Sequence, residues 1–313
     1  MAVVVVGAGI AGLACARVLT GAGVAVRVLE RSRVCGGRLA TKRYDGRRTD
    51  IGAAYFTAQD DDFAALARTW RDAGLVREWT DTLSVLDPDG AHQTTGPMRW
   101  AAPGGLRSLA EDLASGLDVT TGHDVEWIEP GLKVDGVDAD AVVLAMPGPQ
   151  ALRVLHPALA GARQAVENQV WLPSLAVTLV FPTRTWSDFH GAFVNDHPVL
   201  QTVFDDGERR GDGAPVLVAH TTADFTEHYV ADPSAAADEV EAAVRSVLDL
   251  TDNVVTAHVH RWTYARPSQA GRSPYYLDER GIGIAGDAWG SPRVETAWVS
   301  GTALGRTLAT QLS

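Results

Sequence analysis

The sequence is poor in cysteine and lysine. Of 313 residues, only Cys15 and Cys35 are cysteines, and only Lys42 and Lys133 are lysines. Two cysteines are too few for a disulfide framework, and neither belongs to a Cys/His cluster with metal-ligand spacing. We therefore expect a reducing, cytoplasmic environment and no bound metal.

Positive charge and long apolar runs are also scarce. The formal net charge is −12, which opposes binding to nucleic acid because each phosphate contact needs a cation. No run approaches the roughly 18 apolar residues that span a bilayer. The apolar start MAVVVVGAGIAGLACARVL lacks a basic leader and is interrupted by glycines, so we interpret it as folded structure. We expect small-molecule partners and neither nucleic acid nor membrane.

The first thirty residues carry a dinucleotide-binding pattern. A β-branched run at 3–6 is followed by GAGIAG, by helical composition at 13–20, and by an apolar run at 24–29. That run ends at Glu30, where a carboxylate accepts hydrogen bonds from a ribose. The glycines allow a tight turn and let the backbone approach a pyrophosphate at the helix N-terminus. They are Gly7, Gly9 and Gly12.

A second match to the glycine pattern, GIGIAG at 281–286, lacks this context. Eighteen positions beyond Gly286 the residue is Leu304, and no second strand follows. We therefore assign the diphosphate site to the N-terminal match.

A basic loop follows Glu30. Gly36 and Gly37 have no side chain to hold the backbone away from a diphosphate, and Arg38 offers a planar fork of donors for its charge. The other basic residues of the loop are better interpreted as solvent-exposed surface charges: Arg31, Arg33, Lys42 and Arg43.

Near the C-terminus the sequence predicts a strand, then Gly286 and Asp287, then a helix that starts around Ser291 or Pro292. An acid at the carboxyl end of a strand in a doubly wound sheet lies where ligands bind. The N-terminus of the following helix adds free N–H groups and partial positive charge.

Together these motifs resemble the flavin-dependent amine oxidase superfamily, and more closely its renalase-like members. The superfamily motifs are GAGIAG, Glu30, GGR (36–38), VVLAMP (142–147), GD (286–287) and RVETAWVSG (293–301). The renalase-like stretches are DIGAAYFT (50–57), WAAPGGLRSLAEDLA (100–114), VLVAHTTADFTEHY (216–229) and HRWTYARP (260–267). The resemblance implies an α/β fold with a Rossmann-type FAD-binding domain and an inserted α+β substrate domain. No cysteine near the C-terminus is placed to bond a flavin, so the FAD should be non-covalent.

The resemblance also implies a set of cofactor residues. It places Ala11, Glu30, Arg38, Ala54, Tyr55 and Asp287 at cofactor positions, and it brings the backbone of Val125, in a strand HDVEWI, to adenine. The predicted set is completed by Gly7, Gly9, Gly12, Gly37, Gly286 and Val294.

Between the FAD segments the sequence becomes rich in strands. Runs at 175–181, 199–204, 216–222 and 256–265 predict a mixed or antiparallel sheet, and 234–250 predicts an amphipathic helix. The FAD-binding domain is therefore predicted to be discontinuous, with residues 1–58, 101–150 and 268–313, and the substrate domain to hold residues 59–100 and 151–267.

Alternation along the last of these strands places His258, His260, Trp262 and Tyr264 on one face. If that face lies against the flavin it forms a wall for a planar ring, although an aromatic stripe on a strand is more often ordinary core. His220 is either a satisfied core histidine or a substrate contact. The candidate pocket residues are Tyr55, His220, Trp262, Tyr264 and Trp289.

The scarcity of lysine favours one of the reactions known for this superfamily over another. Amine oxidases of this superfamily usually hold a water near flavin N5 with a lysine of the substrate domain, and neither lysine lies in the predicted one. Hydride transfer from a dihydropyridine needs positioning more than a base. As the resemblance also implies, we expect oxidation of misreduced 2- or 6-dihydro isomers of NAD(P)H, with O2 as electron acceptor and H2O2 as product. The alternatives are oxidation of an amine or other small molecule, and a flavin-bound sensing protein without turnover.

Overall fold

The computed structural model describes residues 2–186 and 189–312, and the chain forms two compact units. The first unit combines Met1–Leu39, Arg107–Trp171 and Arg266–Ser313, and the second combines Ala40–Leu106 and Leu172–Ala265. Each unit is thus assembled from separate stretches of chain. The first unit ends at residue 39, whereas the sequence places the first boundary at 58. Residues 40–58, with Lys42 among them, therefore lie in the second unit.

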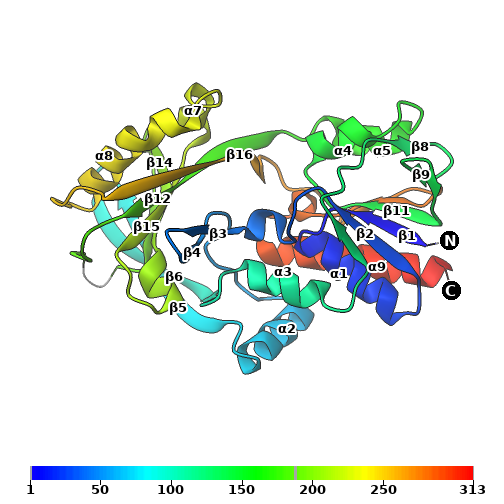
Figure 1. Ribbon diagram of the computed structural model, residues 1–313, viewed down its shortest axis with the longest axis horizontal. Coiled ribbons are helices and arrows are strands. Elements are labelled where there is room, and N and C mark those ends of the chain that lie inside the picture. The colour runs from blue at the N-terminus through cyan, green and yellow to red at the C-terminus, as the bar shows by residue number, and fades with distance from the viewer. Residues whose placement is uncertain (1, 187–188, 313) are drawn as a thin grey trace. The chain divides into compact units, whose positions relative to one another are not determined.

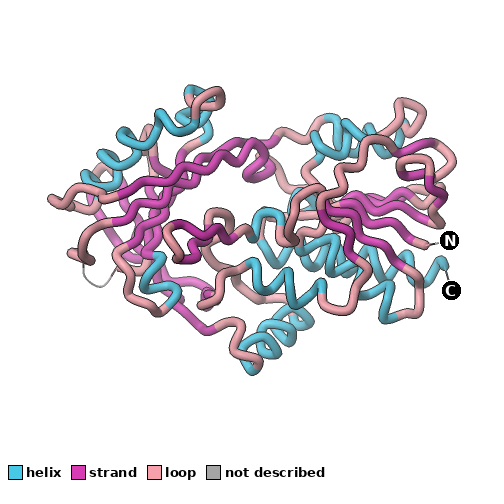
Figure 2. Tube along the Cα trace, in the orientation of Figure 1, coloured by secondary structure: helices cyan, strands magenta, loops and turns pink. Residues whose placement is uncertain are grey.

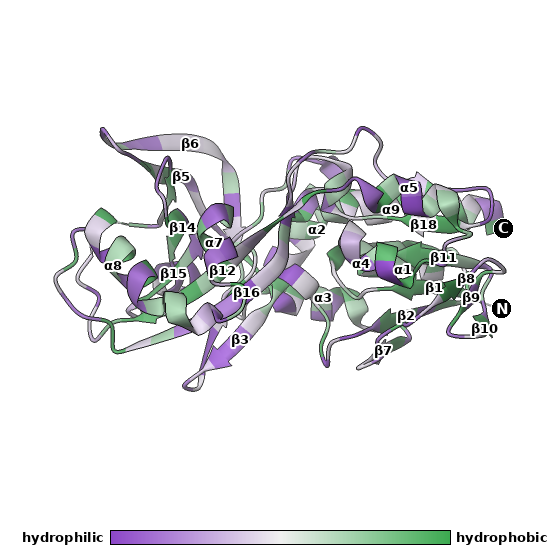
Figure 3. Ribbon diagram, turned by 90° about the horizontal axis from the view of Figure 1, so that it is seen from above, coloured by the Kyte–Doolittle hydropathy of each residue, from purple (hydrophilic) through white to green (hydrophobic). Residues whose placement is uncertain are grey.

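A six-stranded sheet forms the centre of the first unit, in the order β17-β18-β11-β1-β2-β7. All neighbouring strands are parallel except β17, which is antiparallel to β18. Strands β1, β11 and β18 are hydrophobic along their length (Figure 3), as expected for a sheet covered on both faces. The strands are β1 (Val3–Val6), β2 (Val26–Glu30), β7 (Val119–Thr121), β11 (Ala141–Leu144), β17 (Tyr276–Leu277) and β18 (Ile282–Ile284). The predicted Rossmann-type arrangement is confirmed.

Helices cover both faces of this sheet. Helices α1 (Ile10–Gly21), α3 (Arg107–Ala114) and α9 (Val294–Leu312) lie on one face, and α4 (Gly148–Val154) and α5 (Ala160–Glu167) lie on the other (Figure 1). Small residues bring α1 and α9 close together, since a Cβ added at Gly301 would lie 2.0 Å from the Ala11 carbonyl oxygen. A three-stranded sheet, β8 (Ile128–Glu129), β9 (Lys133–Val134) and β10 (Val137–Asp138), completes the unit.

The second unit contains a seven-stranded sheet in the order β16-β12-β15-β14-β13-β5-β6. Strands β13 and β5 are parallel, and the other pairs recorded are antiparallel, so the sheet is mixed, as predicted. The strands are β5 (Arg77–Asp87), β6 (Gly90–Ala101), β12 (Trp171–Val180), β13 (Gly191–Val194), β14 (Leu200–Asp205), β15 (Val216–Thr221) and β16 (Thr256–Pro267). The four predicted strands are present.

One face of this sheet packs against helix α8 (Ala237–Val247), whose Val240 and Val244 enter the core beside Leu175, Val177 and Val203. The helix is preceded by a short 3-10 turn, η2 (Pro233–Ala236), and α7 (Ala223–His228) lies before it. The predicted amphipathic helix over 234–250 is therefore present but shorter.

The remaining elements of the second unit are short. A hairpin of β3 (Thr41–Tyr44) and β4 (Arg47–Asp50) leads into an irregular stretch, visible as loop in Figure 2, and α2 (Asp61–Asp72) follows it. A single-turn helix, α6 (Asp206–Arg210), connects β14 to β15. Within the described residues, no helix combines the length and apolar character needed to cross a bilayer.

Candidate functional site

The glycine-rich turn after β1 leaves no room for side chains at two positions. Gly7 has φ +106°, and a Cβ there would lie 2.7 Å from the Ala145 carbonyl oxygen. A Cβ at Gly12 would lie 2.0 Å from the Gly7 carbonyl oxygen. At Gly9, by contrast, an added Cβ meets nothing within 4 Å. The turn is thus packed tightly against the sheet and open at Gly9, which fits a diphosphate that approaches the backbone there.

Helix α1 begins directly after this open glycine. Gly9 is its N-cap and provides no side-chain cap, and the first turn contains no acid. The first intrahelical hydrogen bond runs from Leu13 N to Gly9 O at 3.0 Å. The earlier N–H groups, with that of Ala11 among them, are therefore available to an anion, and the helix dipole favours negative charge at this end.

The Glu30 carboxylate lies at the end of β2, as predicted, and its residue is 8% exposed. Its Oε2 accepts a hydrogen bond from Ala8 N at 2.8 Å, and its Oε1 accepts one from Ser32 N at 2.7 Å. These two bonds fix the carboxylate beside the glycine-rich turn. Each oxygen retains a lone pair with which to accept a ribose hydroxyl.

The loop that contains Gly36 and Gly37 is bonded to the same turn. Gly36 N donates to Ala8 O at 2.9 Å, and a Cβ at Gly37 would meet the Gly9 Cα at 3.6 Å. Both glycines have positive φ, +120° and +52°. The sequence motif GG therefore serves a close approach of two backbone segments at the predicted diphosphate site.

Arg38 and Asp287 lie far apart in sequence and meet in the first unit. The guanidinium donates two hydrogen bonds to the carboxylate, Nη1 to Oδ2 at 2.7 Å and Nη2 to Oδ1 at 2.6 Å. The guanidinium carbon also lies 5.0 Å from the ring centroid of Trp171. This bidentate pair joins the loop after β2 to the turn after β18, and the side chains are 30% and 9% exposed. The two residues thus occupy one location, as the cofactor prediction requires.

The C-terminal motif starts with Gly286 at φ +154°, and Asp287 opens a 3-10 turn, η3 (Asp287–Trp289). The last helix was predicted to start around Ser291 or Pro292, and α9 begins slightly later, at Val294. The Thr296 hydroxyl donates to the Ser291 carbonyl at 2.6 Å and holds 291–293 as a bend outside the helix. Trp289 is partly buried against the core formed by the sheet, α4 and α5. Its predicted contact with substrate stays a prediction.

Val125 lies in a loop, so its predicted placement in a strand is wrong. The neighbouring N–H groups of Glu126 and Trp127 donate to the Asp135 carboxylate at 3.0 and 2.9 Å, and therefore do not pair with another strand. Within the part of the chain that the structure describes, the Val125 N–H and carbonyl groups have no hydrogen-bond partner, and the residue is 5% exposed. Its backbone is available to a ligand, as the resemblance implies.

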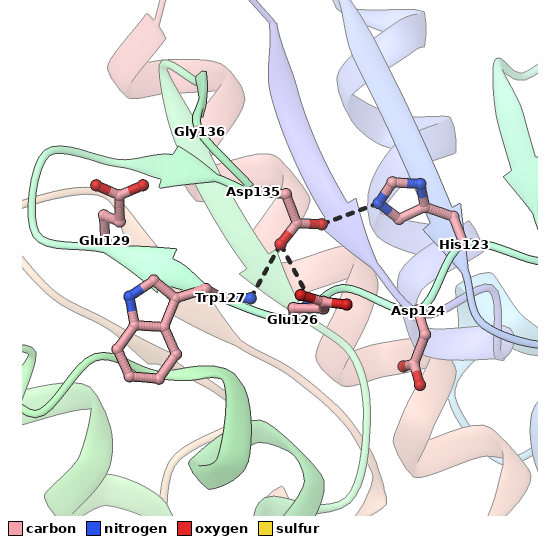
Figure 4. A pocket seen from close by; sticks show the side chains of 7 residues that line it. All are labelled: His123, Asp124, Glu126, Trp127, Glu129, Asp135 and Gly136. Atoms are coloured by element: carbon pink, nitrogen blue, oxygen red, sulfur yellow. Dashed lines mark hydrogen bonds and ion pairs between the residues drawn. The ribbon is translucent and has the colours of Figure 1, made fainter.

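A surface concavity of about 450 Å³ surrounds this loop (Figure 4). The Asp135 carboxylate receives both loop N–H groups and lies 3.0 Å from the Nε2 of His123. It therefore closes the loop on itself, and the other carboxylates oppose any phosphate here. The lining residues are His123, Asp124, Glu126, Trp127, Glu129, Asp135 and Gly136.

In the second unit Tyr55 belongs to an aromatic cluster that the sequence did not indicate. Its ring centroid lies 5.7 Å from that of Phe204 and 6.0 Å from that of Trp79. The guanidinium carbon of Arg99 lies 5.4 Å from the Tyr55 ring centroid. Ala54 packs against the same cluster. Trp79 and Arg99 come from β5 and β6, neither of which is among the strands predicted from the sequence.

The predicted aromatic face of β16 contacts the chain between residues 42 and 51. The His258 ring stacks on Tyr44 with centroids 4.1 Å apart, and His260 Nδ1 lies 3.0 Å from Lys42 Nζ. Trp262 Nε1 donates to the Ile51 carbonyl at 2.6 Å. Tyr264 is partly buried and, among the described residues, forms no ring contact or hydrogen bond. Three of the four side chains therefore support neighbouring structure, and Tyr264 is free to meet a ligand.

His220 is a neutral, engaged histidine. It lies on β15 directly across from Thr202 of β14, whose Oγ1 is 3.3 Å from His220 Nδ1. Burial lowers the pKa of His220 to about 4, although hydrogen bonding to the carbonyls of Ile51 and Gly52 acts in the opposite direction. Burial and the nearby Lys42 charge likewise lower the pKa of His260 to about 4.

A buried ion network was also missed by sequence reasoning. Arg209 Nη1 donates to Asp50 Oδ2 at 2.8 Å, Arg210 Nε donates to Asp206 Oδ2 at 3.0 Å, and Arg209 also pairs with Asp206. The four side chains are between 0% and 3% exposed. Burial opposes these charges, but the three guanidinium groups nearby, Arg47 included, keep the pKa of Asp206 low. The only sequence signal was the charge density of DDGERRGD.

Comparison with known proteins identifies the family. Residues 71–303 match the family described as flavin containing amine oxidoreductase, and residues 5–72 match the NAD(P)-binding Rossmann-like domain. A putrescine oxidase from Kocuria rosea is 36% identical over 140 residues, 42% of this chain and 28% of that protein. A phytoene dehydrogenase from Streptomyces griseus is 48% identical over 73 residues, 22% of this chain and 14% of that protein. The chain thus spans less than a third of the length of these relatives.

Solved structures share the fold over the whole chain. Cyclohexylamine oxidase from Brevibacterium oxydans aligns with a TM-score of 0.78 at 13% identity, covering 100% of this chain and 99% of that one. Wild-type putrescine oxidase bound to putrescine aligns with a TM-score of 0.75 at 18% identity, covering 99% and 98%. The chain belongs to the flavin-containing amine oxidoreductase family, and its cofactor is FAD.

Proposed function

We propose that this protein is an FAD-dependent oxidase of misreduced NAD(P)H isomers, the 2- and 6-dihydro forms, as its resemblance to renalase-like flavoproteins implies. FAD, when bound, supplies a hydride acceptor at N5 and returns the two electrons to O2. The balanced reaction converts one dihydronicotinamide, one proton and one O2 into NAD(P)+ and H2O2. In such a reaction the protein must bind, orient and shield the substrate ring.

The observation that carries the proposal is the state of His220. It is the one imidazole among the candidate pocket residues, its pKa is about 4, and its ring is engaged with Thr202 and two backbone carbonyls. It is therefore neutral at physiological pH and not poised as a base. A dihydropyridine that loses hydride needs no base because aromatisation absorbs the developing charge. Orientation by aromatic side chains suffices, and we propose Tyr264, Tyr55 and Trp289 for this role.

The cofactor residues follow the same proposal. We assign the diphosphate to the glycine-rich turn, the N-terminus of α1 and Arg38, and the adenosine ribose to Glu30. Asp287 is assigned to the ribityl chain or a phosphate, with Val294 at the start of the nearby helix. Val125 meets adenine through its backbone. The remaining proposed contacts are Gly7, Gly9, Ala11, Gly12, Gly37, Ala54, Tyr55 and Gly286.

A second candidate is oxidation of an amine. Glu208 Oε2 accepts a hydrogen bond from Trp79 Nε1, lies 3.0 Å from His190 Nδ1, and is 28% exposed. Trp79 in turn contacts Tyr55. A carboxylate beside aromatic rings is chemistry that attracts an ammonium group. The named relatives include oxidases of putrescine and cyclohexylamine, which also favours this candidate.

Peroxide release from the FAD-loaded protein separates the candidates. We expect 2- or 6-dihydro-NAD to give H2O2 and NAD+ in equal amounts, with kcat/KM at least 100-fold above that for putrescine or cyclohexylamine. The reverse ranking would establish the amine oxidase and overturn the proposal. A flavin-loaded protein that releases no peroxide with any of these compounds would instead support the sensing alternative.

A further inference from the structure

The backbone from Ile51 to Tyr55, here called segment 51–55, is held through its carbonyl oxygens. Trp262 Nε1 on β16 donates to Ile51 O at 2.6 Å, and Arg209 Nη1 on α6 donates to Ala54 O at 2.7 Å. The carbonyls of Ile51 and Gly52 also lie beside the His220 ring on β15, where they raise the pKa of His220 against the larger effect of burial. Three separate elements of the second unit thus fix the acceptors of one short stretch of irregular backbone.

The N–H groups of segment 51–55, in contrast to its carbonyl groups, mostly have no partner among the described residues of the protein. Ile51 N donates to Ala40 O at 3.0 Å, and beyond the segment Phe56 N donates to Trp100 O at 3.2 Å. Between them, the N–H groups of residues 52–55 donate to no group in the described part of the chain, and these residues are only partly buried. Buried backbone donors are nearly always paired, so four consecutive N–H groups that pair with no described group of the protein in a partly buried segment mark a candidate binding surface. They are available to a ligand that accepts hydrogen bonds.

The anchor behind the segment is rigid. Asp50 accepts hydrogen bonds from the Thr41 hydroxyl, from Leu106 N at 3.1 Å, and from Arg209 at 2.8 Å. Arg209 is 1% exposed and pairs also with the fully buried Asp206. A guanidinium fork fixed by two carboxylates has little freedom left, so its bond to the Ala54 carbonyl holds the backbone in one place.

From these contacts we propose that Trp262, His220 and Arg209 are positioning residues that hold segment 51–55 so that its free N–H groups meet the acceptor atoms of the flavin ring. The inference rests on the proposed function, which assigns Ala54 and Tyr55 to the cofactor. Preorganised N–H donors stabilise negative charge that develops on a bound group. Correct placement of the segment therefore raises the reduction potential of the flavin, and Trp262 acts through the Ile51 carbonyl instead of by stacking on substrate.

Trp262→Phe is the decisive variant, because it removes the N–H donor and keeps an aromatic ring. Trp186→Phe is its matched control, since Trp186 Nε1 donates to Asp205 Oδ2 at the same 2.6 Å within the same unit, and among the described residues Trp186 forms no hydrogen bond or ring contact with segment 51–55. The readouts are measured on substrate-free FAD-loaded protein: the midpoint potential, the visible absorption spectrum, and the Kd for FAD.

We expect Trp262→Phe to shift the midpoint potential to more negative values, to alter the flavin spectrum, and to raise the Kd for FAD about tenfold. Trp186→Phe should lower the melting temperature and leave all three readouts unchanged. Arg209→Lys keeps the positive charge but loses the guanidinium fork, so it should shift the midpoint potential in the same direction as Trp262→Phe. If Arg209→Met folds, its shift should be larger than that of Arg209→Lys.

An unchanged spectrum and potential in Trp262→Phe, with a raised KM for substrate alone, would assign Trp262 to substrate binding and overturn the inference. Equal shifts in Trp262→Phe and Trp186→Phe would overturn it as well, because they would indicate a general loss of structure. A wild-type protein that binds FAD but oxidises no dihydronicotinamide would refute only the proposed function, since none of these readouts involves substrate. A wild type that takes up no FAD would refute both.

Discussion

Gly9→Ala tests the diphosphate cradle without disturbing the protein around it. A Cβ at Gly9 meets no heavy atom within 4 Å, and the residue already has φ −77° and ψ 174°, which alanine adopts without strain. The free energy of unfolding of the apoprotein should therefore change by less than about 0.5 kcal/mol. The added methyl group occupies the space through which a diphosphate would approach the turn.

The effect on the cofactor should be large. A methyl group holds the diphosphate away from the N–H groups of α1, and loss of a hydrogen bond to a charged group costs roughly 1.5–3 kcal/mol. We expect the Kd for FAD to rise on the order of 100-fold, equivalent to about 2.7 kcal/mol. Titration of apoprotein with FAD, followed by quenching of flavin fluorescence, measures the Kd, and urea unfolding measures the stability.

Two other glycines of the same region provide the comparison. Gly21→Ala, at the far end of α1, also meets nothing within 4 Å and should bind FAD like wild type. Gly12→Ala would place its Cβ 2.0 Å from the Gly7 carbonyl oxygen and should lose both stability and FAD. Wild-type affinity in Gly9→Ala would refute the assignment of the diphosphate to this turn.

Three further predictions follow from packing and charge. Gly301→Ala places a Cβ 2.0 Å from the Ala11 carbonyl oxygen, so urea unfolding should show a loss of about 3 kcal/mol; a stabilised variant would contradict the close packing of α1 and α9. The pKa values of His220 and His260 are lowered from 6.5 to about 4, so the unfolded chain binds more protons than the folded one between these pH values. The free energy of unfolding should fall as pH drops through this window, by up to about 1.4 kcal/mol per pH unit for each histidine, and His260→Gln should flatten the slope in a pH series of urea melts. Burial raises the pKa of the Cys15 thiol to about 12. A thiol reagent should therefore leave Cys15 unmodified in the native protein and label it only after the protein is unfolded.

Much of the first unit could be predicted because its chemistry is local in sequence. The turn, the helix and Glu30 follow one another within thirty residues, and their spacing alone predicts a parallel βαβ unit. The start of the last helix was predicted too early because proline is common both in the first turn of a helix and in a bend that precedes one. The sequence alone does not distinguish these two cases at Pro292. The rule that ligands bind at the carboxyl ends of parallel strands was enough to predict one location for Arg38 and Asp287, but not their bidentate hydrogen-bonded pair.

The second unit was less predictable because its contacts join distant residues. Nothing near Asp50 in the sequence indicates that Arg209 neutralises it, and nothing near Trp262 indicates that its N–H donates to Ile51. The boundary expected at residue 58 places Lys42 in the FAD-binding domain, whereas the first compact unit ends its opening stretch at Leu39 and Lys42 lies in the second unit. Lys42 Nζ lies 3.0 Å from His260 Nδ1, so the second unit does contain a lysine.

We propose that the protein uses its FAD to accept hydride from a dihydronicotinamide. Anaerobic rapid mixing of the FAD-loaded protein with 6-dihydro-NAD, followed through the visible flavin absorption, tests it most directly. We predict bleaching within seconds, with one NAD+ formed per flavin, and oxidised flavin with H2O2 after air is admitted. Flavin that stays oxidised with 2- and 6-dihydro-NAD yet bleaches rapidly with putrescine or cyclohexylamine would contradict the account.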